Sequence, residues 1–226
     1  MAEGACACAA SGVLWMVALS WHAPGGAFRA AVRGIIGGIA AFSAAWVAYA
    51  LVERVGMRMS WDEVVAGGGS GLAVAGAIGL IEESAKLFGM ALVAVGLQPV
   101  GRASSVRTVL SVSATFSVLE AALTLHGAGA PLLILRSLLA PVAHAALSAP
   151  LGLVLVGGRT GMRWIVPALL TAAALHATAD LSLATPPFGR AGYAAVLILP
   201  AVFLHLHARL SWARDARTPP GGLGAA

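Results

Sequence analysis

The sequence predicts an all-α fold, a polytopic integral membrane bundle of about seven transmembrane helices. Apolar residues make up 59% of the 226 residues and charged residues only 10%, whereas soluble domains carry about 25% charged residues. Apolar stretches of about 20 residues, the length that crosses a bilayer as a helix, follow one another with short connections. We therefore expect one membrane-embedded domain over residues 1–226, with the net charge of +5 set by loop arginines rather than by a nucleic-acid surface.

The first 98 residues of the chain predict two spans, a break and a third span. The second apolar run contains Gly37-Gly38, and such small residues let membrane helices pack closely. The run over residues 64–98 is too long for one span, because its 35 residues would cover roughly 52 Å of helix. Glycines at 67, 68, 69 and 71 divide this run into a short interfacial or re-entrant piece and a span. The expected spans are residues 7–21, 34–52 and 73–97, and the first of these is the shortest.

The rest of the chain predicts four more spans. An uncharged turn at residues 127–131 and a Thr-Pro-Pro sequence at 185–187 mark two of the connections. Pro141 and Pro150 lie inside the fifth span, where a proline can kink a helix and free backbone carbonyls. The tail, residues 218–226, is rich in Pro and Gly and is expected to be disordered. The expected spans are residues 106–125, 132–156, 164–184 and 193–210.

The arginines predict the orientation of these spans, since cytoplasmic loops carry an excess of Lys and Arg. With the N-terminus outside, nine arginines fall on the inner side of the membrane. The outer side then holds only three, which are Arg54, Arg58 and Arg190. The sequence therefore predicts that the N-terminus is outside and that the C-terminus is cytoplasmic.

Ionisable residues interrupt the third span. Glu82, Glu83 and Lys86 lie within five residues of one another, and Lys86 is the only lysine of the chain. A charged group at the centre of a membrane helix costs at least about 2.5–3.5 kcal/mol, so a cluster of three indicates a function. Glu82 and Lys86 are spaced i,i+4 and are expected to neutralise each other. Glu83 lies about 100° around the helix and is expected to remain free for chemistry.

The same i,i+4 spacing recurs in each of the next three spans. The pairs are Phe116 with Glu120, His144 with Ser148, and His176 with Asp180. Residues at i and i+4 share one helix face, so we expect the four helices to point these side chains at one shared interior. By their positions along the spans, the polar groups lie roughly 8–18 Å below the outer membrane face.

This set of residues suits hydrolysis. A carboxylate can take a proton from water as a general base, and a histidine can hold the oxyanion that forms. Alternatively, His144, His176 and a carboxylate such as Glu83 can ligate a divalent metal ion such as zinc, which activates water. The residues leave both possibilities open. The sequence contains neither H-E-x-x-H nor G-x-S-x-G, which excludes the zincin and serine-hydrolase arrangements.

Two functions of other classes use the same residues. In a proton- or ion-coupled transporter the buried acids form a relay, and in a non-catalytic scaffold they stabilise a surface that binds a partner helix. A transporter of this size is expected to show an internal repeat, and the sequence shows none.

Each motif also has a purely structural explanation. The acidic pair can form an ion pair with Lys86 or Arg136, and the histidines can be hydrogen-bonded core residues. Ser148 can join helices through a hydrogen bond, and Phe116 can act in packing alone. The convergence of four such pairs favours a functional site over these separate explanations.

Taken in order, the motifs resemble those of PrsW-type intramembrane proteases. The matching motifs are Glu82-Glu83-x-x-Lys86, Phe116-x-x-x-Glu120, His144 with Ser148-Ala-Pro-Leu-Gly152, and His176-x-x-x-Asp180. They are also similar to those of the wider CPBP group, which includes the CAAX prenyl endopeptidases. The resemblance covers residues 81–180, inside a motif-bearing core of residues 73–184. Position 121 departs from the family, because it is Ala where the family leads us to expect Asn.

The resemblance implies an endopeptidase that cleaves a membrane-anchored protein, such as an anti-sigma factor, near the outer face of a bacterial inner membrane. Its partners are then the protein substrate and the lipid bilayer, with no nucleic acid. Glu83, with Glu82, is expected to activate water. His144 and His176 are expected to hold the oxyanion or a metal ion. The supporting residues are Lys86, Phe116, Glu120, Ser148 and Asp180.

The predicted orientation can be tested with alkaline phosphatase, which folds only where its disulfides form, outside the cytoplasm. A fusion to the C-terminus is expected to be inactive in cells, and a fusion after Gly56, in the predicted outer loop, is expected to be active. An active C-terminal fusion would contradict the orientation.

Overall fold

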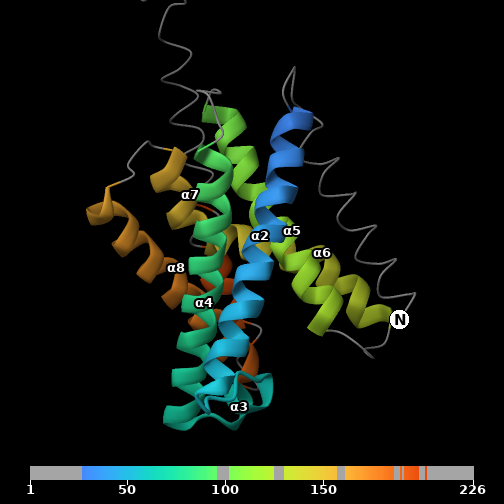
Figure 1. The fold of residues 1–226 in the computed structure, drawn as a ribbon. Helices are drawn as coiled ribbons and strands as arrows, with labels where there is room; N and C mark the ends of the chain where they lie inside the picture. The colour runs from blue at the N-terminus through green and yellow to red at the C-terminus, as the bar shows by residue number, and fades with distance from the viewer. Residues whose placement is uncertain are drawn as a thin grey trace, which may run out of the picture.

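The computed structural model describes residues 27–95, 102–124, 130–156, 161–185, 189, 191–198 and 202, and every regular element in these residues is an α-helix. This confirms the all-α class. The labelled helices are α2 (Ala27–Arg54), α3 (Trp61–Ala66), α4 (Gly68–Val95), α5 (Arg102–Thr124), α6 (Ala130–Leu147), α7 (Ala149–Val156) and α8 (Met162–Ala184) (Figure 1). Residues 191–198 are also helical.

Within the described residues, two helices are long and apolar enough to cross a membrane, Phe28–Arg54 and Met162–Ala184. The bent pair α6 and α7 makes a third if it is counted as one span. The 28-residue helix α4 carries the charged cluster within its apolar sequence. The predicted first span, most of the seventh and the tail at 218–226 lie outside the described residues, so the number of seven spans stays a prediction.

The glycine-rich break before α4 lies where the sequence predicts it. Gly67 and Gly68 have φ values of 72° and 66°, a region that favours glycine. Gly67 lies between α4 and the short helix α3. The first turn of α3 is capped by the Ser60 hydroxyl, which accepts a hydrogen bond from the Glu63 amide. Helix α4 begins at Gly68 rather than at residue 73, so it includes most of the glycines that were expected to lie outside the span.

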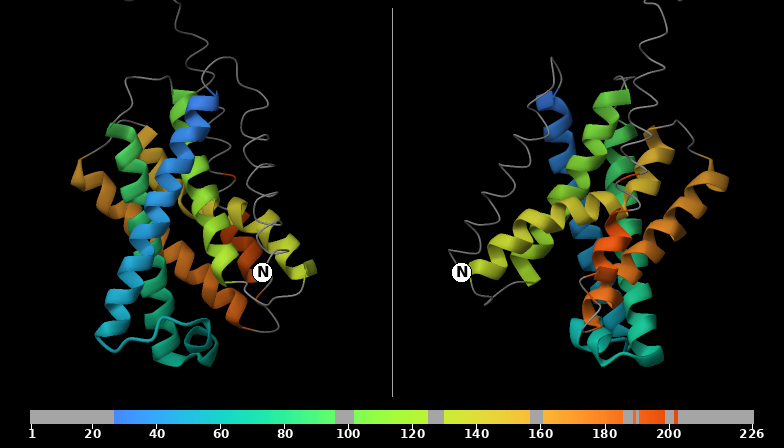
Figure 2. Two further views of the ribbon diagram at one scale, coloured as in Figure 1. Left: turned by 45° about the vertical axis from the view of Figure 1, so that its right-hand side comes forward. Right: turned by 180° about the vertical axis from the view of Figure 1, so that it is seen from behind.

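The segment predicted as one span over residues 132–156 consists of two helices. Helices α6 and α7 are bent by 55° at Ser148, and Figure 2 shows α6 inclined to the upright helices. Pro141 lies inside α6 without ending it. The break lies at Ser148, and Pro150 lies in the first turn of the new helix α7, where a proline is tolerated because its missing N–H would have no partner within the helix.

Helix α2 packs closely against α4 and α5 through glycine contacts (Figure 1). A Cβ atom on Gly37 would lie 2.9 Å from the Gly89 carbonyl oxygen and 2.8 Å from Val112 Cγ2. A Cβ atom on Gly38 would overlap the side chain of Thr115. Only glycine therefore permits this approach of the backbones.

The buried core lies between these helices and the pair α7 and α8. Ala41 of α2, Phe116 of α5, Leu151 of α7 and Ala172 of α8 belong to one buried cluster. Large apolar side chains, Trp46 among them, are exposed on the outside of the bundle. A surface of this kind suits contact with lipid.

The glycine contact between α2 and α4 generates a stability prediction. Changing Gly89 to Ala is expected to lower the free energy of unfolding by about 1–3 kcal/mol, because the new methyl group overlaps the Gly37 carbonyl. The measurement is thermal or denaturant unfolding in detergent micelles. Gly76→Ala, on the same helix with no neighbouring atom within 4 Å, is the matched control and should not lose stability. Equal stability of the two variants would contradict the close packing.

Candidate active site

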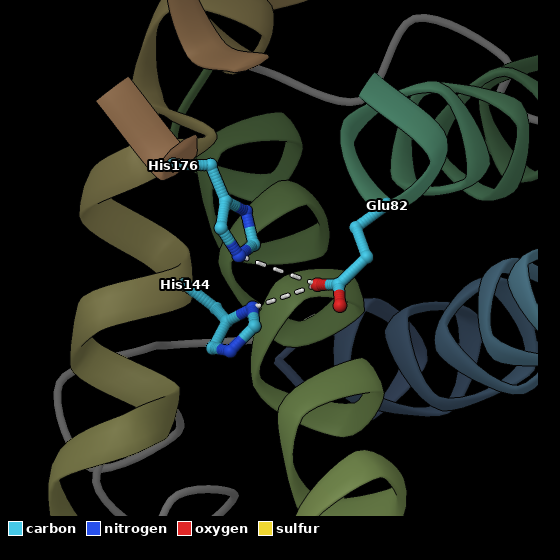
Figure 3. Close-up of side chains that lie close together, drawn as sticks. All are labelled: Glu82, His144 and His176. Carbon is cyan, nitrogen blue, oxygen red and sulfur yellow. Dashed lines mark ion pairs between the residues drawn. The ribbon is translucent and has the colours of Figure 1, made fainter. Parts of the chain in front are cut away.

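The structure brings the polar side chains of four helices and the α6–α7 break together in the interior of the bundle. Figure 3 shows Glu82 of α4 facing His144 of α6 and His176 of α8. The nine predicted site residues that are linked by contacts in this cluster are Glu82, Glu83, Lys86, Phe116, Glu120, His144, Ser148, His176 and Asp180.

Glu83 is completely buried, and both of its carboxylate oxygens are engaged. Its Oε1 atom accepts a hydrogen bond from Lys86 Nζ at 2.7 Å and lies 2.9 Å from His176 Nδ1. Its Oε2 atom accepts a hydrogen bond from the Ser148 hydroxyl at 2.7 Å. The prediction that Glu83 remains free is therefore wrong, because side chains from other helices occupy both oxygens.

Glu82 provides the free carboxylate oxygen instead. Its Oε1 atom accepts a hydrogen bond from the Tyr49 hydroxyl at 2.8 Å. Its Oε2 atom is buried and has no hydrogen-bond partner among the described residues. This oxygen lies 3.6 Å from His176 Nε2 and 3.8 Å from His144 Nδ1.

Lys86 lies between the two glutamates, but its shortest contact is not the predicted one. Its Nζ atom is 3.6 Å from Glu82, at spacing i,i+4, and 2.7 Å from Glu83, at spacing i,i+3. The same atom is 2.8 Å from His144 Nδ1 and 4.7 Å from the centre of the Phe116 ring. The sequence therefore predicted the correct cation, Lys86, but the carboxylate closest to it is Glu83 and not the predicted Glu82. Arg136, the other cation that the sequence offers as a partner of the two glutamates, has its side chain outside the described part of the chain.

Each histidine has a carboxylate on the nitrogen that faces away from Glu82. His144 Nε2 is 3.0 Å from Glu120 Oε2, and His176 Nδ1 is 2.9 Å from Glu83 Oε1. On that side the ring N–H donates to the carboxylate, which leaves His144 Nδ1 and His176 Nε2 without a proton and with their lone pairs on the side of Glu82. Carboxylates orient the histidine ligands of metal sites in the same way.

The arrangement fits a divalent metal ion. Glu82, His144 and His176 each offer one ligand atom, and these atoms all lie within 4.8 Å of one another. Glu82 Oε2 lies 3.6 Å from His176 Nε2 and 3.8 Å from His144 Nδ1, close to the distance of about 3.4 Å between two ligand atoms of a tetrahedral zinc ion at about 2.1 Å from each. Two imidazoles and one carboxylate are also a ligand set that zinc accepts. Glu83, predicted as the carboxylate ligand, is replaced in this group by Glu82.

Tyr49 is the site residue that the sequence analysis missed. It lies on α2, which carries none of the motifs, and it contacts Glu82 across 33 positions of sequence. The available signal was its rarity, because the chain has only two tyrosines and this one lies within an apolar span. A phenol buried in such a span needs a hydrogen-bond partner.

Comparison with known protein families agrees with this geometry. The model of the PrsW family intramembrane metalloproteases matches residues 28–205, which include Tyr49 and all nine predicted site residues. The chain belongs to the PrsW family of intramembrane metalloproteases. No curated protein and no solved structure matches it significantly. This PrsW-family chain is therefore a protease with a protein substrate in the membrane, as the resemblance of its motifs predicts.

The hydrogen bond between Tyr49 and Glu82 generates the next prediction. Tyr49→Phe is expected to lower the free energy of unfolding by about 1–3 kcal/mol, because the buried carboxylate loses its donor. The measurement is the unfolding midpoint in detergent. Trp46→Phe, at an exposed position of the same helix, is the control and should leave the midpoint unchanged. An unchanged midpoint for Tyr49→Phe would show that the phenol does not stabilise Glu82.

Proposed function

We propose that this PrsW-family protein hydrolyses a peptide bond of a membrane-anchored protein at a zinc centre formed by Glu82, His144 and His176. The observation that carries the proposal is the buried Oε2 atom of Glu82, which lacks a hydrogen-bond partner among the described residues and faces two histidine nitrogens. The ion pair of this oxygen with Lys86 is long, at 3.6 Å, and a bound divalent cation would compensate the buried charge more directly. A divalent ion held by these three residues would act as a Lewis acid that lowers the pKa of water and polarises the peptide carbonyl.

The surrounding carboxylates then divide into two roles. Glu83 and Glu120 orient the rings of His176 and His144, since each lies within 3.0 Å of a ring nitrogen. Asp180 lies 3.8 Å from His176 Nε2, and its side chain keeps 18% of its surface exposed. We assign Asp180 to accept the proton from water, because a general base must reach the water that it activates. This assignment moves the role of base away from the fully engaged Glu83.

The substrate that we propose is a protein with a single membrane anchor, of the anti-sigma-factor kind, cleaved near the outer membrane face. The arginine distribution supports an orientation with the N-terminus outside and the C-terminus cytoplasmic, in a bacterial inner membrane. In this topology seven spans include residues 7–21 and 193–210, and the site lies in the outer half of the bilayer. The family match favours proteolysis over the transporter and scaffold alternatives.

The catalytic prediction concerns Glu82. Glu82→Gln is expected to reduce cleavage of a single-span substrate by about 100-fold or more, because it removes the anionic ligand while keeping the size of the side chain. The measurement is cleavage in liposomes that contain purified enzyme and substrate. Glu53→Gln, an exposed glutamate at the end of α2, is the matched control and should retain full activity. Undiminished activity of Glu82→Gln would overturn the proposal.

Removal of the metal separates the two chemistries that the residues allow. A chelator is expected to abolish cleavage, and added zinc is expected to restore it. If activity survives complete removal of metal, the result would instead indicate that Glu82 acts directly as the general base and that the histidines hold the oxyanion.

A further inference from the structure

The Lys86 ammonium lies among the atoms that would hold the metal ion. Its Nζ atom is 2.8 Å from His144 Nδ1 and 3.6 Å from Glu82 Oε2, so it contacts two of the three candidate ligands. The side chain is completely buried, and it is the only lysine in the chain. Among the described residues, it also contacts Glu83 Oε1 at 2.7 Å and the face of the Phe116 ring.

The contact with His144 excludes a metal ion at the same nitrogen. An imidazole nitrogen that carries no proton has one lone pair, and here it accepts the hydrogen bond from the ammonium. The other ring nitrogen lies 3.0 Å from Glu120 and cannot replace it. A second positive charge within about 4 Å would also repel a divalent ion strongly in a buried site.

We infer that Lys86 is a tethered cation that occupies the metal ligands in the metal-free protein and is displaced from His144 when the metal binds. The inference rests on the proposed function, because it concerns how the same centre is loaded. After displacement the ammonium keeps Glu83 and the Phe116 ring as partners, so it need not leave the interior. The protein then has two mutually exclusive states, one in which Lys86 contacts His144 Nδ1 and one in which the metal ion binds that nitrogen.

A simple counter-ion role for Lys86 predicts the opposite result. If the lysine only holds Glu83 and thereby His176 in place, its removal disorders the ligands and weakens metal binding. If it competes with the metal, its removal frees the lone pair of His144 and strengthens metal binding. The sign of the change in affinity therefore decides between the two roles.

The test is a zinc titration of the purified full chain in detergent, against a fluorescent chelator of known affinity. Lys86→Met is expected to bind zinc about tenfold more tightly than the wild type or better, since a competing positive charge is gone. Lys86→Arg keeps the charge and should bind no more tightly than the wild type. Arg163→Met removes the same charge from an exposed position of α8 and is the matched control, with unchanged affinity expected. Equal or weaker binding by Lys86→Met would overturn the inference.

The stability of the variant supplies a second measurement. Without zinc, Lys86→Met should unfold at a lower temperature than the wild type, because Glu83 loses its charged partner. If the variant does not fold without metal, purification with zinc is expected to recover it, since the ion replaces the lost charge. Failure of zinc to recover it would overturn the inference.

The failure of the inference and the failure of the proposed function are distinguishable on the same preparations. If neither the wild type nor Lys86→Met binds zinc or another divalent ion, no metal competes with Lys86 and the inference falls. Cleavage of the liposome substrate by that wild-type protein would then show whether the proteolytic function survives without a metal.

Discussion

The burial of acidic side chains around a single ammonium is the constraint on which the rest of this structure depends. In an apolar bundle, an unpaired carboxylate costs several kcal/mol, so Glu82 and Glu83 require a positive charge and hydrogen-bond donors. Lys86 supplies the charge, while Tyr49 and Ser148 supply donors at 2.8 and 2.7 Å. These two donors come from α2 and from the break after α6. These hydrogen bonds to the acids therefore form only when these segments pack in one arrangement.

Small residues and a helix break make that arrangement possible. The contact between Gly37 and Gly89 brings α2 against α4, and this approach allows Tyr49 to reach Glu82 from a helix without any motif. Helices α6 and α7 are bent by 55° relative to each other at Ser148. The Ser148 hydroxyl donates a hydrogen bond to Glu83 at this interruption of the helix. Packing features that carry no chemistry themselves thus determine which polar groups meet.

Adjacent glutamates acquire different roles because neighbouring residues of a helix point about 100° apart. Glu83 points into the interior, where Lys86, His176 and Ser148 engage both of its oxygens. Glu82 keeps one buried oxygen without a hydrogen-bond partner among the described residues, and that oxygen faces both histidines. This division explains why the chemistry that we propose is centred on Glu82, while Glu83 orients the groups around it.

The sequence by itself determined the helical class, the break before α4 and the set of side chains that gather in the interior. These features follow from hydrophobicity, glycine content and i,i+4 spacing, which are local properties of the chain. Only the tertiary structure decided that Lys86 pairs most closely with Glu83, that Tyr49 joins the site and that Glu82 keeps the free oxygen. The reason is physical: the side chains from other helices that reach the two glutamates lie 33 to 93 positions away in the sequence, and no local pattern tells which of two adjacent carboxylates they will contact.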